Sequence, residues 1–158
     1  MNLNFILNGE DTSLTADSNE SVYQVLKREG HLFERTLACL KGDCCRCLIS
    51  LDGKLVLSCR MPFFQIRGRE VVTLEGQRMT QGFQSLLGHY KSQGIPICQE
   101  CTGTQIFQIL VLLDNLKKPT LSTLLDAIED IPCRCGSRPS LEKAVSIYYE
   151  EQRVAGNV

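Results

Sequence analysis

The stretch CLKGDCCRC, residues 39–47, places four cysteines within nine positions of the chain. Cys39, Cys44 and Cys47 have the spacing Cx4Cx2C, and thiols gathered in one short loop are typical of a metal centre. Gly42 lies inside this loop, where the absence of a Cβ lets the backbone come close to a bound group. A metal group held by these three thiolates needs a further ligand from another part of the chain.

The segment that follows the loop predicts where the fourth ligand lies. CLISL and KLVLSC flank the dipeptide Asp52–Gly53, which favours a two-residue turn between antiparallel strands. Counting back along this hairpin places Cys47 opposite Ser58, with facing Cα atoms about 4.5 to 5.5 Å apart, so Cys59 is a near neighbour. A Cx4Cx2C triple with a fourth cysteine beyond a hairpin is the plant-type pattern for a [2Fe-2S] cluster. The ligands that we predict for this cluster are Cys39, Cys44, Cys47 and Cys59.

The composition excludes several classes of protein. A formal net charge of -1 and an aromatic content of 6% provide neither a basic field nor stacking platforms for nucleic acid. The N-terminal MNLNFILNGEDTS lacks a secretory signal, and the apolar run IFQILVLL is too short to span a bilayer, so we expect a cytoplasmic protein without a membrane anchor. In a reducing compartment, an odd total of nine cysteines indicates metal binding or catalysis rather than disulfides.

The first part of the chain predicts a small α+β fold. Asn8–Gly9 separates two alternating runs and favours a type I′ hairpin turn. Residues 22–29 have helical spacing after the capping-rich segment DSNES, and Gly30 lies where a helix commonly ends. The Asp52–Gly53 hairpin follows, and a further strand is predicted over residues 70–76. We therefore expect strands with one crossing helix.

The second part is predicted to be helical. Four segments carry apolar residues at three- and four-residue spacing, namely GFQSLLGHYKSQG, TQIFQILVLLDNLKK, STLLDAIED and SLEKAVSIYYEEQR. Pro119, Pro132 and Pro139 punctuate this region. We place the boundary so that residues 1–77 form one domain and residues 78–158 form a second.

The remaining cysteines form two close pairs. Cys98 and Cys101 precede a predicted helix, whose unpaired backbone amides and positive end favour thiolates. Cys133 and Cys135 lie in the sequence CRC, at the joint of two later helices. We predict that the two pairs clamp a second cluster, which leaves Cys45 as the ninth cysteine. Zinc is the alternative metal, but four-thiolate zinc sites usually use two CxxC-like knuckles, and neither CxC nor Cx4Cx2C matches them.

With both cysteine sets in place, the sequence resembles the small iron–sulfur subunit of the xanthine dehydrogenase family of molybdenum hydroxylases. This family includes carbon monoxide and aldehyde dehydrogenases, and the resemblance covers nearly the whole chain. In the first part it rests on the cysteine loop, on Ser58–Cys59 after the hairpin, and on TLEG at residues 73–76. In the second part, residues 98–102 stand at the family's CGFCT, and residues 133–135 stand at its CRC.

The resemblance implies a ferredoxin-like β-grasp domain followed by a four-helix domain, each holding one [2Fe-2S] cluster. It implies an electron-transfer subunit of an oxidoreductase, without a catalytic site of its own. Electrons would leave a molybdopterin site, pass the helical-domain cluster and then the ferredoxin-domain cluster, and reach FAD. Because the chain stops at Val158, we expect a molybdopterin-binding large subunit and a FAD-binding subunit as partners in a hetero-oligomer.

The sequence departs from the family pattern beside the ligands. Cys45 stands at a position that is normally glycine, where a positive φ would strain a cysteine by about 1 kcal/mol or more. Ile97 replaces a glutamine that the family associates with a contact to the pterin, and Gln99–Glu100 replace Gly-Phe. Arg138 replaces a tyrosine after CRC. We expect the ligands to persist in altered surroundings, which tune the cluster potential.

Two other functions fit parts of this pattern. A stand-alone ferredoxin with two clusters would shuttle electrons between other enzymes and would remain a coloured monomer without partners. A zinc-stapled interaction module would be colourless.

Overall fold

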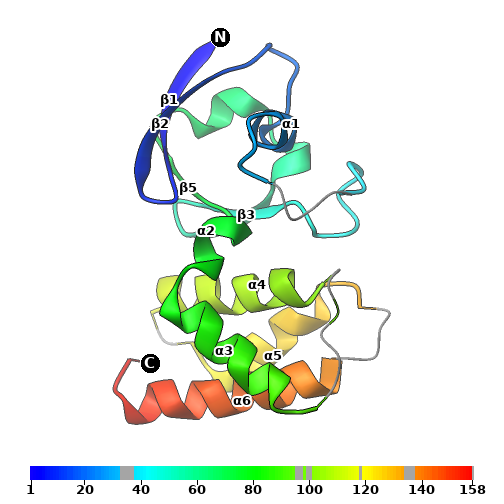
Figure 1. Cartoon of the computed structure of the whole chain (residues 1–158), viewed down its shortest axis with the longest axis vertical. Helices are drawn as coiled ribbons and strands as arrows, with labels where there is room; N and C mark the ends of the chain where they lie inside the picture. Colours follow the sequence, from blue (N-terminus) through cyan, green and yellow to red (C-terminus); the bar gives the residue numbers. More distant parts are fainter. Residues whose placement is uncertain (33–37, 95–97, 99–100, 118, 134–137, 158) are drawn as a thin grey trace. The chain divides into compact units, whose positions relative to one another are not determined.

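The chain folds into two compact units, Met1–Gln77 and Arg78–Val158. The computed structural model describes residues 1–32, 38–94, 98, 101–117, 119–133 and 138–157 (Figure 1). Four residues singled out in the sequence lie outside this described part, namely Ile97, Gln99, Glu100 and Cys135.

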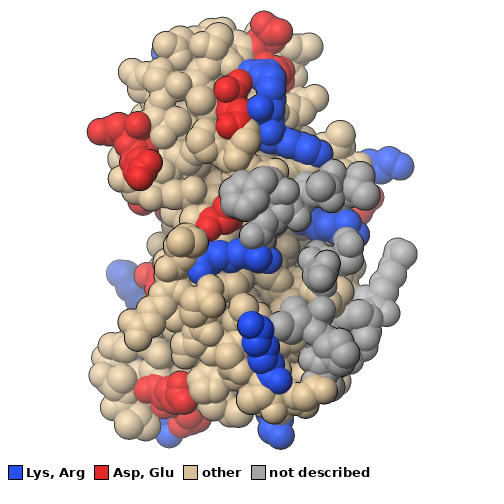
Figure 2. All heavy atoms as spheres, in the orientation of Figure 1, with Lys and Arg blue, Asp and Glu red and all other residues tan. Residues whose placement is uncertain are grey.

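Charged side chains of both signs lie on the face of the molecule shown in Figure 2. Figure 2 shows basic, acidic and uncharged residues alternating on one face of the molecule. Exposed ion pairs join Arg69 to Asp52 at 2.6 Å and Arg153 to Glu150 at 2.7 Å. Such exposed pairs add little to stability, because water screens the attraction between their charges.

The first unit is built on a mixed five-stranded sheet with the order β2-β1-β5-β3-β4. Its central pair, β1 and β5, is parallel, and the other neighbouring strands are antiparallel. A sheet in one unit and helices in both confirm the expected α+β class. The strands are β1 (Asn2–Leu7), β2 (Glu10–Thr15), β3 (Leu48–Leu51), β4 (Lys54–Leu57) and β5 (Glu70–Val72).

Both predicted hairpin turns are confirmed. Asn8 and Gly9 have φ values of 52° and 86°, and Asp52 and Gly53 have values of 48° and 77°. Positive φ at both central residues is the signature of a type I′ turn. The second turn pairs Leu51 with Lys54, as the placement of the fourth thiol requires.

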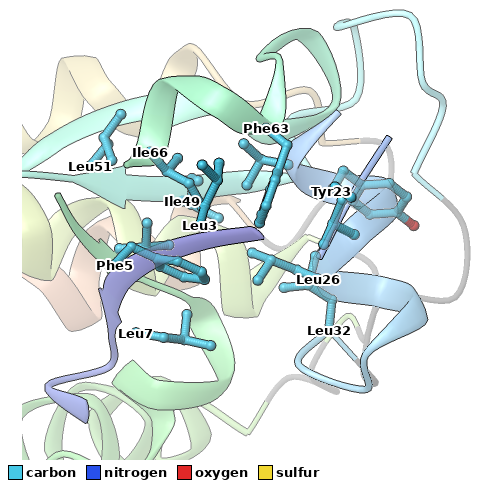
Figure 3. Close-up of a cluster of buried hydrophobic side chains, with 14 of the residues drawn as sticks. Leu3, Phe5, Leu7, Tyr23, Leu26, Leu32, Ile49, Leu51, Phe63 and Ile66 are labelled. Carbon is cyan, nitrogen blue, oxygen red and sulfur yellow. The ribbon is translucent and has the colours of Figure 1, made fainter. Parts of the chain in front are cut away.

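The core of the first unit lies between the sheet, the helix α1 (Val22–Arg28) and the short 3₁₀ helix η2 (Phe63–Ile66). The helix α1 begins where the sequence predicts, because Ser21 and Gln24 form a capping box. Phe5 of β1 meets Phe63 of η2 edge to face, with ring centroids 6.0 Å apart (Figure 3). Aromatic contacts of this kind stabilise a core beyond the area that they bury.

The strand predicted over residues 70–76 is shorter than expected, because β5 ends at Val72. Thr73 is buried, and its Oγ1 accepts the backbone N–H of Gly76 at 3.2 Å, which starts the helix α2 (Leu74–Arg78). The carboxamide of Asn8 holds Thr73 in turn, since its Oδ1 accepts the Thr73 backbone N–H at 2.8 Å. A contact between residues 65 positions apart therefore ends the strand, and local sequence does not reveal it.

The second unit contains four long helices within the residues that the structure describes. Thr80 and Thr120 cap α3 and α5 through their side chains, and Cys101 is the residue before the first turn of α4. Contacts join α3 to α4, α4 to α5, α5 to α6 and α3 to α6. None of the described helices is both long and apolar enough to cross a membrane. The helices are α3 (Gln81–Lys91), α4 (Thr102–Asn115), α5 (Leu121–Glu129) and α6 (Arg138–Val154).

The substitution Gly76→Ala tests the contact that ends β5. A Cβ at this position would overlap the Asn8 carboxamide and lie 2.8 Å from its Nδ2, so the contact to Thr73 would be displaced. We expect the free energy of unfolding to fall by about 1–3 kcal/mol in urea denaturation.

Asn8→Gly provides the matched background for this test. Glycine tolerates the positive φ of the turn and removes the side chain that the new Cβ would meet. Gly76→Ala should therefore cost less in this background than in the wild type. An equal cost in both backgrounds would show that the Asn8 side chain is not the reason for glycine at this position.

Candidate metal centres

The cysteine loop of the first unit curls tightly, because three of its residues have left-handed backbone conformations. Leu40, Gly42 and Cys45 have φ values of 57°, 89° and 55°. The positive φ considered for Cys45 is therefore present, and a residue with a Cβ is strained there. A Cβ added to Gly42 would also meet Cγ of Arg60 at 3.3 Å, so this position has little room for a side chain.

The curl turns backbone amides toward the thiols. The Sγ atom of Cys39 accepts the N–H groups of Lys41 and Asp43, each at 3.4 Å. Hydrogen bonds from backbone amides lower the pKa of the Cys39 thiol to about 6. The amide of Lys41 has the largest effect, followed by those of Cys44 and Asp43. The Cys39 N–H itself donates to Sγ of Cys44 at 3.3 Å. The loop therefore favours negative charge on sulfur, which is the form that binds metal.

The hairpin brings the other two thiols of the first set together as predicted. Cys47 is 2% exposed, and its carbonyl accepts both the N–H of Ser58 at 3.1 Å and the Ser58 hydroxyl at 2.6 Å. Burial raises the pKa of the Cys59 thiol to about 12, and the hydrogen bond to Cys47 and its charge add to the effect. The charge of Cys39 acts on Cys59 in the same direction, so the first set converges on one region.

Three thiols of the second set lie in direct contact. The Sγ atom of Cys101 is 3.5 Å from that of Cys98 and 3.7 Å from that of Cys133. Cys101 is buried directly before the first turn of α4. Burial is the largest cause of the raised pKa of its thiol, and the neighbouring thiols of Cys98 and Cys133 raise it further. Cys98 and Cys133 are separated by 35 positions in the sequence, so the contact depends on how the helices pack. Cys135 lies in the segment that the structure does not describe.

Arg138 makes a hydrogen bond to the segment that precedes Cys133. It is the first residue of α6, and its guanidinium donates to the carbonyl of Ile131 at 3.2 Å. Ile131 is buried and lies two positions before Cys133. This arginine therefore links the first residue of α6 to a residue just after α5.

The donor chemistry of both sets fits an iron–sulfur cluster. Every donor is a thiol, and no disulfide joins the cysteines that the structure describes. Burial opposes thiolate formation at Cys59 and Cys101, and a bound cation reverses this effect by supplying positive charge. Within the described ranges, no three or more Cys, His, Asp or Glu side chains are placed to hold a metal ion. The match to a cluster lies in the donor set, the amide donors and the sulfur contacts.

Two buried glutamines on α4 were not expected from the sequence. The run IFQILVLL was interpreted as helical core, yet Gln108 inside it and Gln105 directly before it are buried. The available signal was their spacing, because Cys101, Gln105 and Gln108 follow the pattern i, i+4, i+7.

No family model matches the sequence, but individual proteins match it over most of their length. The chain is 26% identical over 144 residues to the isoquinoline 1-oxidoreductase subunit alpha of Brevundimonas diminuta, covering 90% of this chain and 94% of that protein. It is 29% identical over 144 residues to the nicotinate dehydrogenase small FeS subunit of Eubacterium barkeri, covering 90% and 91%. It is 28% identical over 140 residues to the nicotine 6-hydroxylase small subunit of Paenarthrobacter nicotinovorans, covering 88% and 84%.

Solved structures share the fold. A chain of quinoline 2-oxidoreductase from Pseudomonas putida 86 superposes with a TM-score of 0.81 at 21% identity, covering 100% of this chain and 98% of that one. The aldehyde oxidoreductase from Desulfovibrio desulfuricans superposes with a TM-score of 0.75 at 25% identity. In that pair 99% of this chain matches 18% of the larger one.

Cys45→Gly tests whether the ninth cysteine strains the loop without binding metal. Glycine adopts a positive φ without the strain that a Cβ causes, which stabilises the folded chain. Glycine also has more conformational freedom in the unfolded chain, which offsets part of this effect. We expect the free energy of unfolding to rise by about 0.5–1 kcal/mol. Metal content should stay unchanged.

Leu40→Gly is the matched control, because Leu40 has nearly the same φ and is exposed. A comparable gain in both variants identifies backbone strain as the cause. Loss of metal from Cys45→Gly would instead place this thiol among the ligands.

Proposed function

We propose that this chain, which is similar to the small iron–sulfur subunits of molybdenum hydroxylases, holds two [2Fe-2S] clusters and relays electrons between two partner subunits. Electron transfer is the role of an iron–sulfur subunit in such an oxidoreductase. The observation that carries the proposal is the convergence of two separate all-thiol sets, one in each unit.

We assign the ligands by unit. In the first unit, residues 1–77, the cluster is held by Cys39, Cys44, Cys47 and Cys59. In the second unit, residues 78–158, it is held by Cys98, Cys101, Cys133 and Cys135. Gly42 supports the first site, since its N–H favours the thiolate of Cys59 and its missing Cβ leaves room beside Arg60.

The finer architecture follows from this assignment. The helix α1 and the mixed sheet, in which β1 and β5 are parallel, support a β-grasp domain of ferredoxin type. The helices α3 to α6, each packed on two of the others, support a four-helix cluster-binding domain.

The protein performs its role by holding charge rather than by transforming a substrate. Bound at these cysteines, a [2Fe-2S] group supplies a one-electron carrier. In the first unit, N–H groups of the loop donate to Cys39 and Cys44, and such donors stabilise the negative charge that reduction adds. In the second unit, the amide end of α4 lies beside Cys101 and acts in the same direction.

Two partners complete the proposed assembly. One is a large subunit that binds molybdopterin and delivers electrons to the second unit, and the other binds FAD and receives electrons from the first. The relatives support this arrangement, because they are themselves small or alpha subunits. A net charge of -1 supports protein partners over nucleic acid, and a thiol set without disulfides among the described cysteines suits the reducing cytoplasm.

Metal content of the purified chain tests the cluster assignment. Anaerobic preparations should contain about four iron and four sulfide atoms per chain and show visible absorption. Cys44→Ser and Cys133→Ser should each remove about half of the iron, because each breaks one set. Cys45→Ser is the control and should keep all of it.

The result that would contradict this assignment is equally direct. A colourless protein that holds zinc in both sets would favour the interaction module. Full iron in Cys44→Ser together with loss in Cys45→Ser would exchange these two residues in the ligand set.

Copurification tests the subunit role against the stand-alone ferredoxin. Affinity purification of the tagged chain from its native cells should recover molybdenum and flavin in constant proportion to its iron. A chain that elutes as a coloured monomer, free of both, would be a shuttle instead.

A further inference from the structure

A polar stripe runs along α4 from the second thiol set. Cys101, Gln105 and Gln108 lie one turn apart in succession, so they share one face of the helix. Toward the C-terminus the neighbouring buried positions are apolar, as in Ile106 and Phe107, whereas Thr102 and Thr104 on the first turn are buried and polar. Glutamine in such surroundings is rare unless its carboxamide finds hydrogen-bond partners.

Gln105 has no such partner within the part of the chain that the structure describes. It is 1% exposed, and both its Nε2 and its Oε1 are shielded from solvent without a hydrogen bond. A buried amide that makes no hydrogen bond costs free energy, so a partner for it is expected from a group that binds there.

General helix geometry favours a direction of this carboxamide toward the thiols. The backbone N–H of Gln105 donates to the carbonyl of Cys101 at 3.0 Å, so the two residues are one helical turn apart. Because side chains on a helix lean toward its N-terminus, we expect the carboxamide over the turn that begins at Cys101. The Sγ atom of Cys101 is in turn 3.5 Å from that of Cys98.

A second buried polar group at the same place also lacks a partner. Thr102 is 1% exposed, and its Oγ1 makes no hydrogen bond to the described residues. Its backbone N–H donates to the carbonyl of Cys98 at 3.4 Å, and Thr102 directly follows Cys101, so its backbone lies beside both cysteines. Two residues with unsatisfied polar side chains thus lie on the first turn of α4, next to Cys101.

We propose that Gln105 donates its Nε2–H to a sulfur atom of the cluster in the second unit and thereby raises the reduction potential of that cluster. This inference rests on the proposed function. Reduction adds negative charge that is shared with the sulfurs, and a donor aimed at them stabilises the reduced state more than the oxidised state. Gln105 therefore sets how readily the second unit accepts an electron from its donor.

Gln105→Met tests this role, because methionine keeps the length of the side chain and removes the N–H donor. In the full chain carrying its clusters, a redox titration followed by electron paramagnetic resonance should show a lower midpoint for the second-unit signal. The first-unit signal should not move. Cys44→Ser and Cys133→Ser assign the two signals to their units.

Gln108→Met is the matched control. Gln108 is 8% exposed on the same face, and its Oε1 also lacks a partner among the described residues, but it lies a further turn from Cys101. Its substitution should leave both midpoints unchanged. An unchanged midpoint in Gln105→Met, or an equal shift in Gln108→Met, would overturn the proposal.

A measurement on the wild type decides the case even if Gln105→Met binds less iron. With ¹⁵N in the glutamine side chains, pulsed electron paramagnetic resonance of the reduced second-unit signal should detect a coupled nitrogen, and its absence would overturn the hydrogen bond. Failure of the proposed function is distinguishable, since a wild-type chain without a second iron–sulfur signal would refute the cluster itself.

Discussion

The repulsion between thiolates held close together is the constraint on which the rest of the structure depends. Burial disfavours the charged form of Cys59 and of Cys101, and each has further thiols within contact distance. A site of this kind is stable in two ways, either with protons on the sulfurs or with a cation between them. The backbone must therefore hold the thiols in place and also tolerate the charge of the metal-bound state.

The two units meet this constraint by different means. In the first unit, three residues of the loop after Cys39 have positive φ, which turns backbone amides toward the thiols. Those amides lower the pKa of the Cys39 thiol. A rigid hairpin then supplies Cys47 and Cys59 in fixed register. In the second unit, the described thiols lie on segments that flank helices, so packing of α4 and α5 and of α5 and α6 decides the distance from Cys101 to Cys133. The first site is accordingly a property of local sequence, and the second is a property of tertiary structure.

This difference explains how much the sequence alone could predict. Type I′ turns at Asn8–Gly9 and Asp52–Gly53 depend on two residues each. Counting residues back from the second turn was therefore enough to predict that Cys47 lies opposite Ser58. The helix start at Ser21 is equally local. The end of β5 was predicted wrongly, because the Asn8 side chain that holds Thr73 comes from the opposite end of the unit. The partner of Arg138 and the unsatisfied carboxamide of Gln105 also depend on packing, which periodicity does not encode.

Residues beside the ligands show how a relay can change its energetics without changing its ligands. A thiolate ligand cannot be altered without loss of the metal, so variation is confined to the groups that face the sulfurs. In this chain, the backbone amides of the first loop donate to a thiol, and the proposed contact of Gln105 would add a side chain in the second unit. The amides are present whatever side chains the loop carries, so they set a common baseline, whereas a side chain such as that of the buried Gln105 can be changed by a single substitution. An electron carrier between fixed partners needs a potential matched to both, and the side chains of the second unit are where this sequence can adjust that match.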